Sequence, residues 1–158
     1  MIRLVQSLHG KKHPPMAGFT VIELMITVML LAVLAAIAAP NMTSFILATR
    51  VKAAASDMYS ALIFARSEAI KRNADIDIVP VSAWGDGWQV KAGAAILKQQ
   101  DAYPPSLSIV GPVGTITYRR DGRLSGNTTA LYTVSARGHA TVRIKTVNVD
   151  LGGRVLVR

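Results

Sequence analysis

The chain has 158 residues, of which 51% are hydrophobic, and it carries a formal net charge of +9 without any cysteine. Its length suits one small domain with attached segments, and its hydrophobicity predicts a membrane segment. The absence of cysteine excludes disulfides, thiolate catalysis and cysteine-ligated zinc, but it leaves the redox compartment open.

The positive charge is concentrated at the two ends of the chain. Residues 1–18 contain three basic residues and no acid, and residues 119–158 contain eight basic residues against two acids. The first cluster is typical of the cytoplasmic flank of a membrane helix. The second suits a surface that binds a polyanionic partner.

Residues 19–39 form an apolar run with a single charge, Glu23. At about 1.5 Å rise per residue, this run can cross a hydrocarbon core of roughly 30 Å. Because the basic residues precede it, we expect a single membrane pass with a cytoplasmic N-terminus and an exported C-terminal domain. An ordinary signal anchor is an alternative. A secretory signal peptide fits badly, because the run is long and leads through Pro40 into a further helix.

The charge of Glu23 points to a more specific role. A carboxylate inside a bilayer costs on the order of 3 kcal/mol, so it needs a partner. The segment GFTVIE (residues 18–23) resembles the cleavage signal of type IV prepilins and type II secretion pseudopilins.

This resemblance implies three processing residues. In that family a prepilin peptidase cuts after the glycine, here Gly18, and the new N-terminal residue, Phe19, is N-methylated. Glu23 matches the family's glutamate, and in a filament its carboxylate can pair with the terminal amine of a neighbouring subunit. Residues 1–18 are therefore expected to be a removable leader. Pro40 falls where these proteins carry a helix-loosening proline.

Residues 40–73 are expected to continue as an amphipathic helix. Apolar residues recur along it at three- or four-residue spacing, and Asn73 can cap its end. The stripe consists of Ala55, Met58, Leu62, Ala65 and Ala69, and it is widened by Ile63 and Ile70.

Residues 74–158 carry the signals of short strands separated by turns. The expected strands cover residues 75–79, 89–91, 114–119, 131–136, 140–147 and 155–157, and residues 99–112 are expected to form a loop with one edge strand. The predicted fold is α+β and type IV pilin-like: a long N-terminal helix, half transmembrane and half amphipathic, packed against an antiparallel β-sheet domain.

Two further segments narrow the resemblance. ARSEAIKRN (residues 65–73), followed by a strand and Gly87-Trp88, resembles the FimT/GspH family of minor pilins and pseudopilins. This resemblance implies a low-abundance filament subunit whose partners are other major and minor pilins or pseudopilins. FimT-type members are implicated in DNA uptake during natural transformation, and GspH-type members in the type II secretion pseudopilus.

The sequence offers little for catalysis. His139 lies in a glycine-flanked turn, and Asp75 and Asp77 share a strand face without a third ligand at a suitable spacing. We therefore predict neither an enzyme nor a bound metal or cofactor.

The basic C-terminal residues are the remaining candidate site. Arg143 and Lys145 alternate with Val142 and Ile144, which predicts that the basic pair leaves one strand face while the apolar pair faces inward. Such a surface would hold double-stranded DNA through its phosphates. The predicted DNA-binding residues are Arg119, Arg120, Arg123, Arg143, Lys145, Arg154 and Arg158.

The family resemblance bears on two of these residues. DNA-binding FimT proteins carry a Gly-Arg-x-Arg motif, of which this chain keeps Gly153 and Arg154 but has Leu156 in place of the second arginine. Arg158, two residues later, is the candidate substitute. Three alternatives stay open: a solvated basic surface or one that pairs with acidic filament neighbours, a GspH-like pseudopilin without DNA binding, and a subunit that primes pilus assembly.

Overall fold

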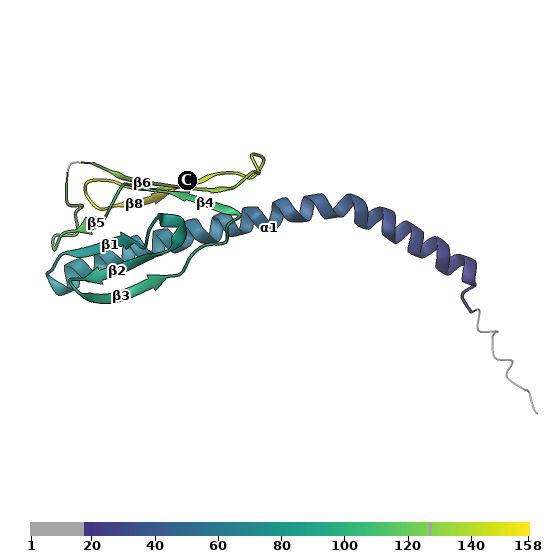
Figure 1. Cartoon of the computed structure of the whole chain (residues 1–158), viewed down its shortest axis with the longest axis horizontal. Helices are drawn as coiled ribbons and strands as arrows, with labels where there is room; N and C mark the ends of the chain where they lie inside the picture. Colours follow the sequence, from purple (N-terminus) through teal and green to yellow (C-terminus); the bar gives the residue numbers. More distant parts are fainter. Residues whose placement is uncertain (1–17, 127) are drawn as a thin grey trace, which may run out of the picture. The chain divides into compact units, whose positions relative to one another are not determined.

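The computed structural model describes residues 18–126 and 128–158, without the side chains of residues 38–41 (Figure 1). The basic residues predicted to form the cytoplasmic flank lie outside this part of the chain. The described chain divides into one unit that ends at Ala39 and a second that spans Pro40–Arg158, and each is considered by itself.

In the first unit, helix α1 (Val21–Arg72) begins just after the predicted cleavage site. Every large apolar side chain described between residues 19 and 37 is at least 52% exposed. Judged by length and composition, no single helix in the described part of the chain qualifies as a membrane span, although Val21–Ile37 and Met42–Arg72 together qualify as a broken one.

The second unit is built around the remainder of α1. The centre of the predicted stripe is confirmed, because Ala55, Met58, Leu62, Ala65 and Ala69 are at most 1% exposed. Its predicted widening is wrong, because Ile63 and Ile70 are 42% and 54% exposed. The helix ends at Arg72, and Asn73 adopts a left-handed conformation with φ of 52°. The amide of Ala74 donates to the carbonyl of Ala69 at 3.2 Å, which closes the helix in the manner expected of an Asn cap.

A first antiparallel sheet follows the helix. Its strands are β1 (Ile76–Pro80), β2 (Trp88–Ala92), β3 (Ala95–Gln100) and β5 (Ile116–Tyr118), in the order β3-β2-β1-β5. A short 3-10 helix, η1 (Trp84–Asp86), links β1 to β2.

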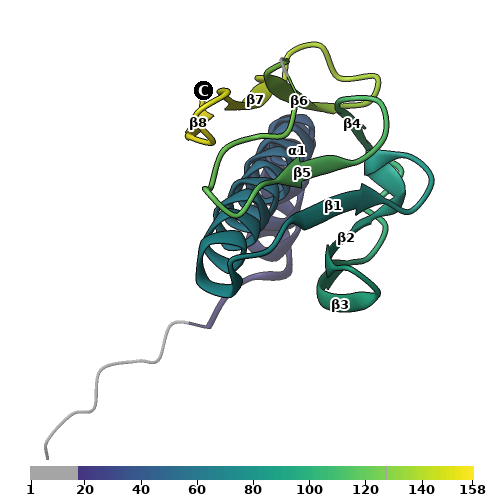
Figure 2. The same ribbon diagram turned by 90° about the vertical axis from the view of Figure 1, so that its left-hand side faces the viewer.

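The second sheet is also antiparallel. It consists of β4 (Leu107–Val110), β6 (Ala130–Ala136), β7 (Lys145–Val149) and β8 (Val155–Val157), in the order β4-β6-β7-β8. Figure 2 shows the two sheets covering two sides of α1, and residues of the helix and both sheets share one buried core. The α+β class is confirmed, with the strands divided between two sheets.

Trp84 joins the two sheets. Its ring meets Tyr132 of β6 edge-on, with ring centroids 4.8 Å apart, and its Nε1 donates to the carbonyl of Pro112 at 2.7 Å. A Cβ on Gly111 would lie 2.7 Å from both rings, so a glycine is needed where the chain passes between them.

Candidate functional site

The predicted processing site lies at the start of α1. The backbone amide and the hydroxyl of Thr20 both donate to Glu23 Oε2, at 2.9 and 2.8 Å, and the Glu23 amide donates to Thr20 Oγ1 at 3.2 Å. These reciprocal bonds form a capping box, which satisfies donors that a helix start leaves unpaired. The role of Thr20 was missed in the sequence, although its Thr-x-x-Glu spacing is the usual signal for such a cap.

Near the C-terminal end of α1, two turns of the domain carry four arginines. Arg119, Arg120 and Arg123 lie in the turn after β5, and Arg154 lies just before β8. We call these four residues the arginine cluster. All four are exposed, and none forms a side-chain salt bridge within the described residues.

The two turns meet through glycine backbones. Gly153 has φ of +79°, and a Cβ added there would collide with the carbonyl oxygen of Gly122. The amide of Leu124 donates to the carbonyl of Leu151 at 3.3 Å, which fastens the same two segments. This contact places the segment of Arg154 beside the turn that carries the other three arginines.

The carboxylates around the arginine cluster hold the backbone. Asp75 accepts from the Arg120 amide at 3.2 Å, and Asp121 accepts from the Arg123 amide at 3.1 Å. Asp150 accepts from the amide of Arg154 at 2.8 Å. The carboxylates therefore shape the turns, and the guanidinium groups stay available to an outside anion.

The helix-end motif supports this arrangement. Arg66 Nη2 donates to the carbonyl of Gly152 at 3.1 Å and so ties the second turn to α1. Glu68 accepts a hydrogen bond from Arg72 and lies 3.6 Å from the Lys71 ammonium. The bond from Arg72 lowers the pKa of Glu68 below its ordinary value, and burial acts in the opposite direction.

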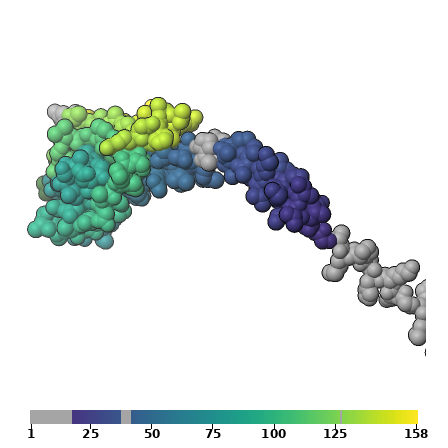
Figure 3. Space-filling model, turned by 45° about the vertical axis from the view of Figure 1, so that its right-hand side comes forward, coloured from purple at the N-terminus to yellow at the C-terminus, as the bar shows by residue number. Residues whose placement is uncertain are grey.

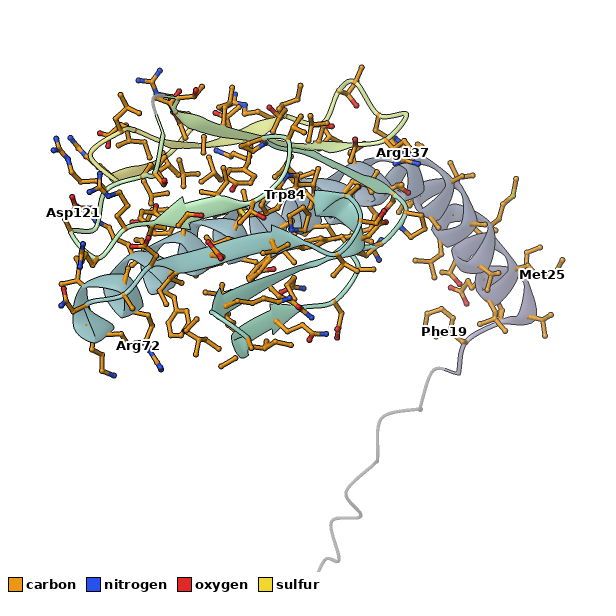
Figure 4. All side chains as sticks on the ribbon, turned by 60° about the vertical axis from the view of Figure 1, so that its left-hand side comes forward. Phe19, Met25, Arg72, Trp84, Asp121 and Arg137 are labelled. Atoms are coloured by element: carbon orange, nitrogen blue, oxygen red, sulfur yellow. The ribbon has the colours of Figure 1, made fainter. Side chains whose placement is uncertain are left out.

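The other predicted DNA-binding residues lie elsewhere. Arg143 belongs to the loop before β7, and Lys145 is the first residue of that strand. Arg158 exchanges backbone hydrogen bonds with Thr146, which places it at this same end of β7, away from Arg154. Figure 4 shows Asp121 and Arg72 toward one end of the domain and Arg137 toward the other.

One predicted pattern is wrong. Ile144 does not face inward with Val142: it is 54% exposed, whereas Val142 is buried. The alternation falls in a loop, because β7 begins at Lys145 rather than at residue 140. Lys145 is half-buried and lies two residues before buried Val147, so both side chains point to the same, inner face of β7. Lys145 therefore does not share an outer face with Arg143. Figure 3 shows the yellow-green residues of this sheet and its loop on one side of the domain.

The residues considered for catalysis form hydrogen bonds that hold the fold or lie exposed in a turn. Asp77 accepts a hydrogen bond from the Thr117 hydroxyl at 2.6 Å, and Asp75 holds the turn described above. His139 is exposed in its turn. Within residues 18–126 and 128–158, no group of three His, Cys, Asp or Glu side chains could hold a metal ion.

An apolar helix with a capped start, continued into a domain of two antiparallel sheets, defines a type IV pilin-like subunit. The family profile described as "Type II transport protein GspH" matches residues 54–153, and the "Prokaryotic N-terminal methylation motif" matches residues 15–39. The chain therefore belongs to the GspH family and has a prepilin-like N-terminus. No protein with a curated description matches the sequence significantly.

Solved structures show the same fold. The type IV minor pilin FimU of Pseudomonas aeruginosa is 23% identical, with a TM-score of 0.62 over 70% of this chain and 89% of FimU. A second crystal form of FimU gives 24% identity and a TM-score of 0.60 over 68% and 91%. The minor pseudopilin EpsH of Vibrio cholerae, from its Type 2 Secretion System, is 14% identical, with a TM-score of 0.55 over 69% and 96%. These neighbours are structural filament proteins rather than enzymes.

Proposed function

We propose that this chain is a minor subunit of a type IV pilus that binds double-stranded DNA through its arginine cluster during uptake in natural transformation. The observation that carries the proposal is the contact between two turns that carry four exposed arginines, none of which forms a salt bridge within the described residues. Guanidinium groups bind phosphates bidentately, and contacts to phosphates alone carry no base sequence. Binding is therefore expected to be non-specific and dependent on salt.

The N-terminal part of the proposal concerns processing. A prepilin peptidase cleaves after Gly18, Phe19 is methylated, and Glu23 pairs with the Phe19 amine of a neighbouring pilin. Before assembly, the protein lies in the inner membrane with a cytoplasmic N-terminus and a periplasmic domain. The match to the methylation motif and the exposed apolar side chains of residues 19–37 support this route.

A matched pair of variants tests DNA binding. The mature chain in detergent micelles is titrated into a labelled duplex at several salt concentrations between about 50 and 200 mM. In one variant the arginine cluster is replaced by glutamine. In the control variant, four basic residues outside the arginine cluster are replaced by glutamine. These are Arg137, Arg143, Lys145 and Arg158.

We expect the cluster variant to lose affinity and the control to keep it. If all four arginines contact phosphates, the slope of log K against log salt should fall by roughly 3 to 4 in the cluster variant. Equal losses in both variants would mean that charge alone, rather than this cluster, attracts DNA. The absence of any binding by the unaltered chain at about 50 mM salt would overturn the proposal.

A second candidate function is that of a pseudopilin in a type II secretion system, with a structural role and no DNA binding. The description of the family and the fold shared with EpsH favour it. It predicts that deletion of the gene impairs secretion and leaves transformation intact. The DNA-uptake proposal predicts the reverse.

A further inference from the structure

A groove runs between α1 and the outer edge of β8. Its larger part has a volume of about 750 Å³ and is lined by Tyr59, Ile63 and Arg66 of the helix and by residues 153–157. A smaller part, of about 220 Å³, continues past Tyr59 and Val157 to Lys52 and Lys145. The floor of this groove is therefore a stretch of helix, and one wall is a strand.

That wall is an unpaired strand edge. β8 is the last strand of its sheet, and its only strand partner in the described part of the chain is β7. Thr146 and Arg158 exchange backbone hydrogen bonds at 2.9 and 3.0 Å, and the Asp150 amide donates to the Arg154 carbonyl at 3.1 Å.

This pattern fixes the direction of the backbone groups. In an antiparallel pair, hydrogen-bonded and non-bonded positions alternate. Leu156 therefore bonds to β7, whereas the N–H and C=O groups of Val155 and Val157 point away from it, toward the groove. Both residues also line the groove. A strand laid beside β8 would find two donors, two acceptors and an apolar surface.

The positive charge of the groove favours a partner segment with acidic side chains. Among the described residues, its lining contains four basic ones and none with a carboxylate: Lys52, Arg66, Lys145 and Arg154. Ile63 on the floor is 42% exposed, which leaves apolar surface for alternate side chains of an added strand.

We propose that this groove docks an extended segment of a neighbouring filament subunit, which adds to β8 as a further strand. The segment alternates apolar side chains, which pack on Tyr59 and Ile63, with acidic side chains that meet the basic lining. Backbone hydrogen bonds supply affinity in this mode of recognition, and side chains supply specificity. The inference does not rest on the proposed DNA binding: Arg119, Arg120 and Arg123 lie outside the groove, and Arg154 is the one residue that belongs both to the arginine cluster and to the groove lining.

A defined peptide tests the proposal on the mature chain in detergent micelles. The probe is a labelled octapeptide that alternates aspartate with valine. Two control peptides have the same sequence. One carries N-methyl groups on the amides of one strand edge and the other carries them on the opposite edge, so that each control blocks one edge. Binding is followed by fluorescence anisotropy, and amide hydrogen exchange is measured by NMR.

We expect saturation with the peptide to slow exchange of the Val155 and Val157 amides by at least about tenfold. The Leu156 amide, which already bonds to β7, serves as the internal reference and should change little. One of the two N-methylated peptides should fail to bind. Unchanged exchange at Val155 and Val157 would overturn the proposal.

Two helix variants locate the peptide. Ile63→Asp places a negative charge on the floor of the groove, and Ile46→Asp places the same charge elsewhere on α1, at a residue of nearly equal exposure, 43% against 42%. We expect affinity to fall about tenfold in Ile63→Asp and by less than about twofold in Ile46→Asp. Equal effects would place the peptide outside the groove. Protection of Val155 and Val157 by a DNA duplex, with none by the peptide, would assign the groove to nucleic acid and equally overturn the proposal.

Discussion

Gly122 and Gly153 decide how the basic residues are grouped. The chain brings two turns so close that a side chain on Gly153 has no space, and this glycine also adopts a left-handed conformation with φ of +79°. An L-residue in that region costs about 1 kcal/mol or more before any collision is counted. Positions without a side chain therefore set the spacing of the arginine cluster.

The first prediction concerns Gly153→Ala. Gly138 has a similar φ of +73°, but a Cβ there meets nothing within 4 Å, so Gly138→Ala is a control for conformational cost alone. We expect Gly153→Ala to lower the free energy of unfolding by roughly 1–3 kcal/mol more than Gly138→Ala, as measured by denaturant titration. Similar values for the two variants would contradict the close contact between the turns.

Glu68 leads to a prediction about pH. Its carboxylate is nearly buried and is bound by Arg72, which lowers its pKa in the folded protein below the ordinary 4.5. A lowered pKa stabilises the folded state above the unfolded pKa, and the contribution disappears as the pH falls through the folded pKa. Glu68→Gln should therefore melt below the unaltered protein at neutral pH, with a difference that narrows below about pH 4.5. Melting curves between neutral and acidic pH measure this, and a difference independent of pH would contradict it.

At the scale of elements, the two sheets are joined at the Trp84–Tyr132 contact, where β4 ends and the chain turns at Gly111. A Cβ at Gly111 would lie 2.7 Å from both rings, whereas a Cβ at Gly85 meets nothing within 4 Å. Neither glycine has a left-handed φ, so the pair differs mainly in crowding.

We expect Gly111→Ala to destabilise the domain by roughly 1–3 kcal/mol, because the rings must move apart. Gly85→Ala should change stability by less than about 0.5 kcal/mol. Thermal unfolding measures the cost, and near-ultraviolet circular dichroism reports the packing of Trp84. An unchanged aromatic spectrum together with unchanged stability would contradict the crowding at Gly111.

Local periodicity explains which elements the sequence predicted well. The stripe on α1, the cap at Asn73 and strand β1 follow from short-range patterns and are present in the structure. β3 was missed because Ala95–Gln100 is a half-exposed edge strand without a clear alternation of apolar and polar residues. The division into two sheets depends on pairings such as that of β4 with β6, which join distant segments that no local pattern connects.

Prediction of the candidate site was limited in the same way, because local patterns do not reveal tertiary contacts. The sequence identified every arginine of the cluster, because residue type and charge density are visible without a structure. It could not group them, because Arg154 joins the others only through the tertiary contact of Gly153 with Gly122. The alternation of residues 142–145 was misleading for a related reason: a loop carried the pattern of a strand.

At the scale of the whole molecule, the exposed apolar side chains of residues 19–37 need a membrane or other subunits to cover them. Glu23 is the acidic residue within that stretch, and in the single chain its carboxylate binds Thr20. In a filament, we propose that it also meets the Phe19 amine of a neighbour. Loss of its charge should then affect assembly more than loss of the cap.

The fourth prediction separates these two roles. Glu23→Gln removes the charge, and Thr20→Val removes the hydroxyl but keeps the carboxylate. We expect both variants to be cleaved after Gly18, as shown by the mass of the mature chain. Incorporation into sheared filaments should fall about tenfold in Glu23→Gln and by less than about twofold in Thr20→Val. Normal incorporation of Glu23→Gln would contradict the proposed pairing.

The bond from Arg66 to Gly152 also has a mechanical meaning. Arg66 belongs to α1, which begins at Val21, and the carbonyl that it holds lies two residues before Arg154. If DNA binds at Arg154, as proposed, this bond gives a pull on the turn a second route into the helix, in parallel with the backbone that leads into β7 and β8. The second turn is thereby braced on α1 as well as on its own sheet.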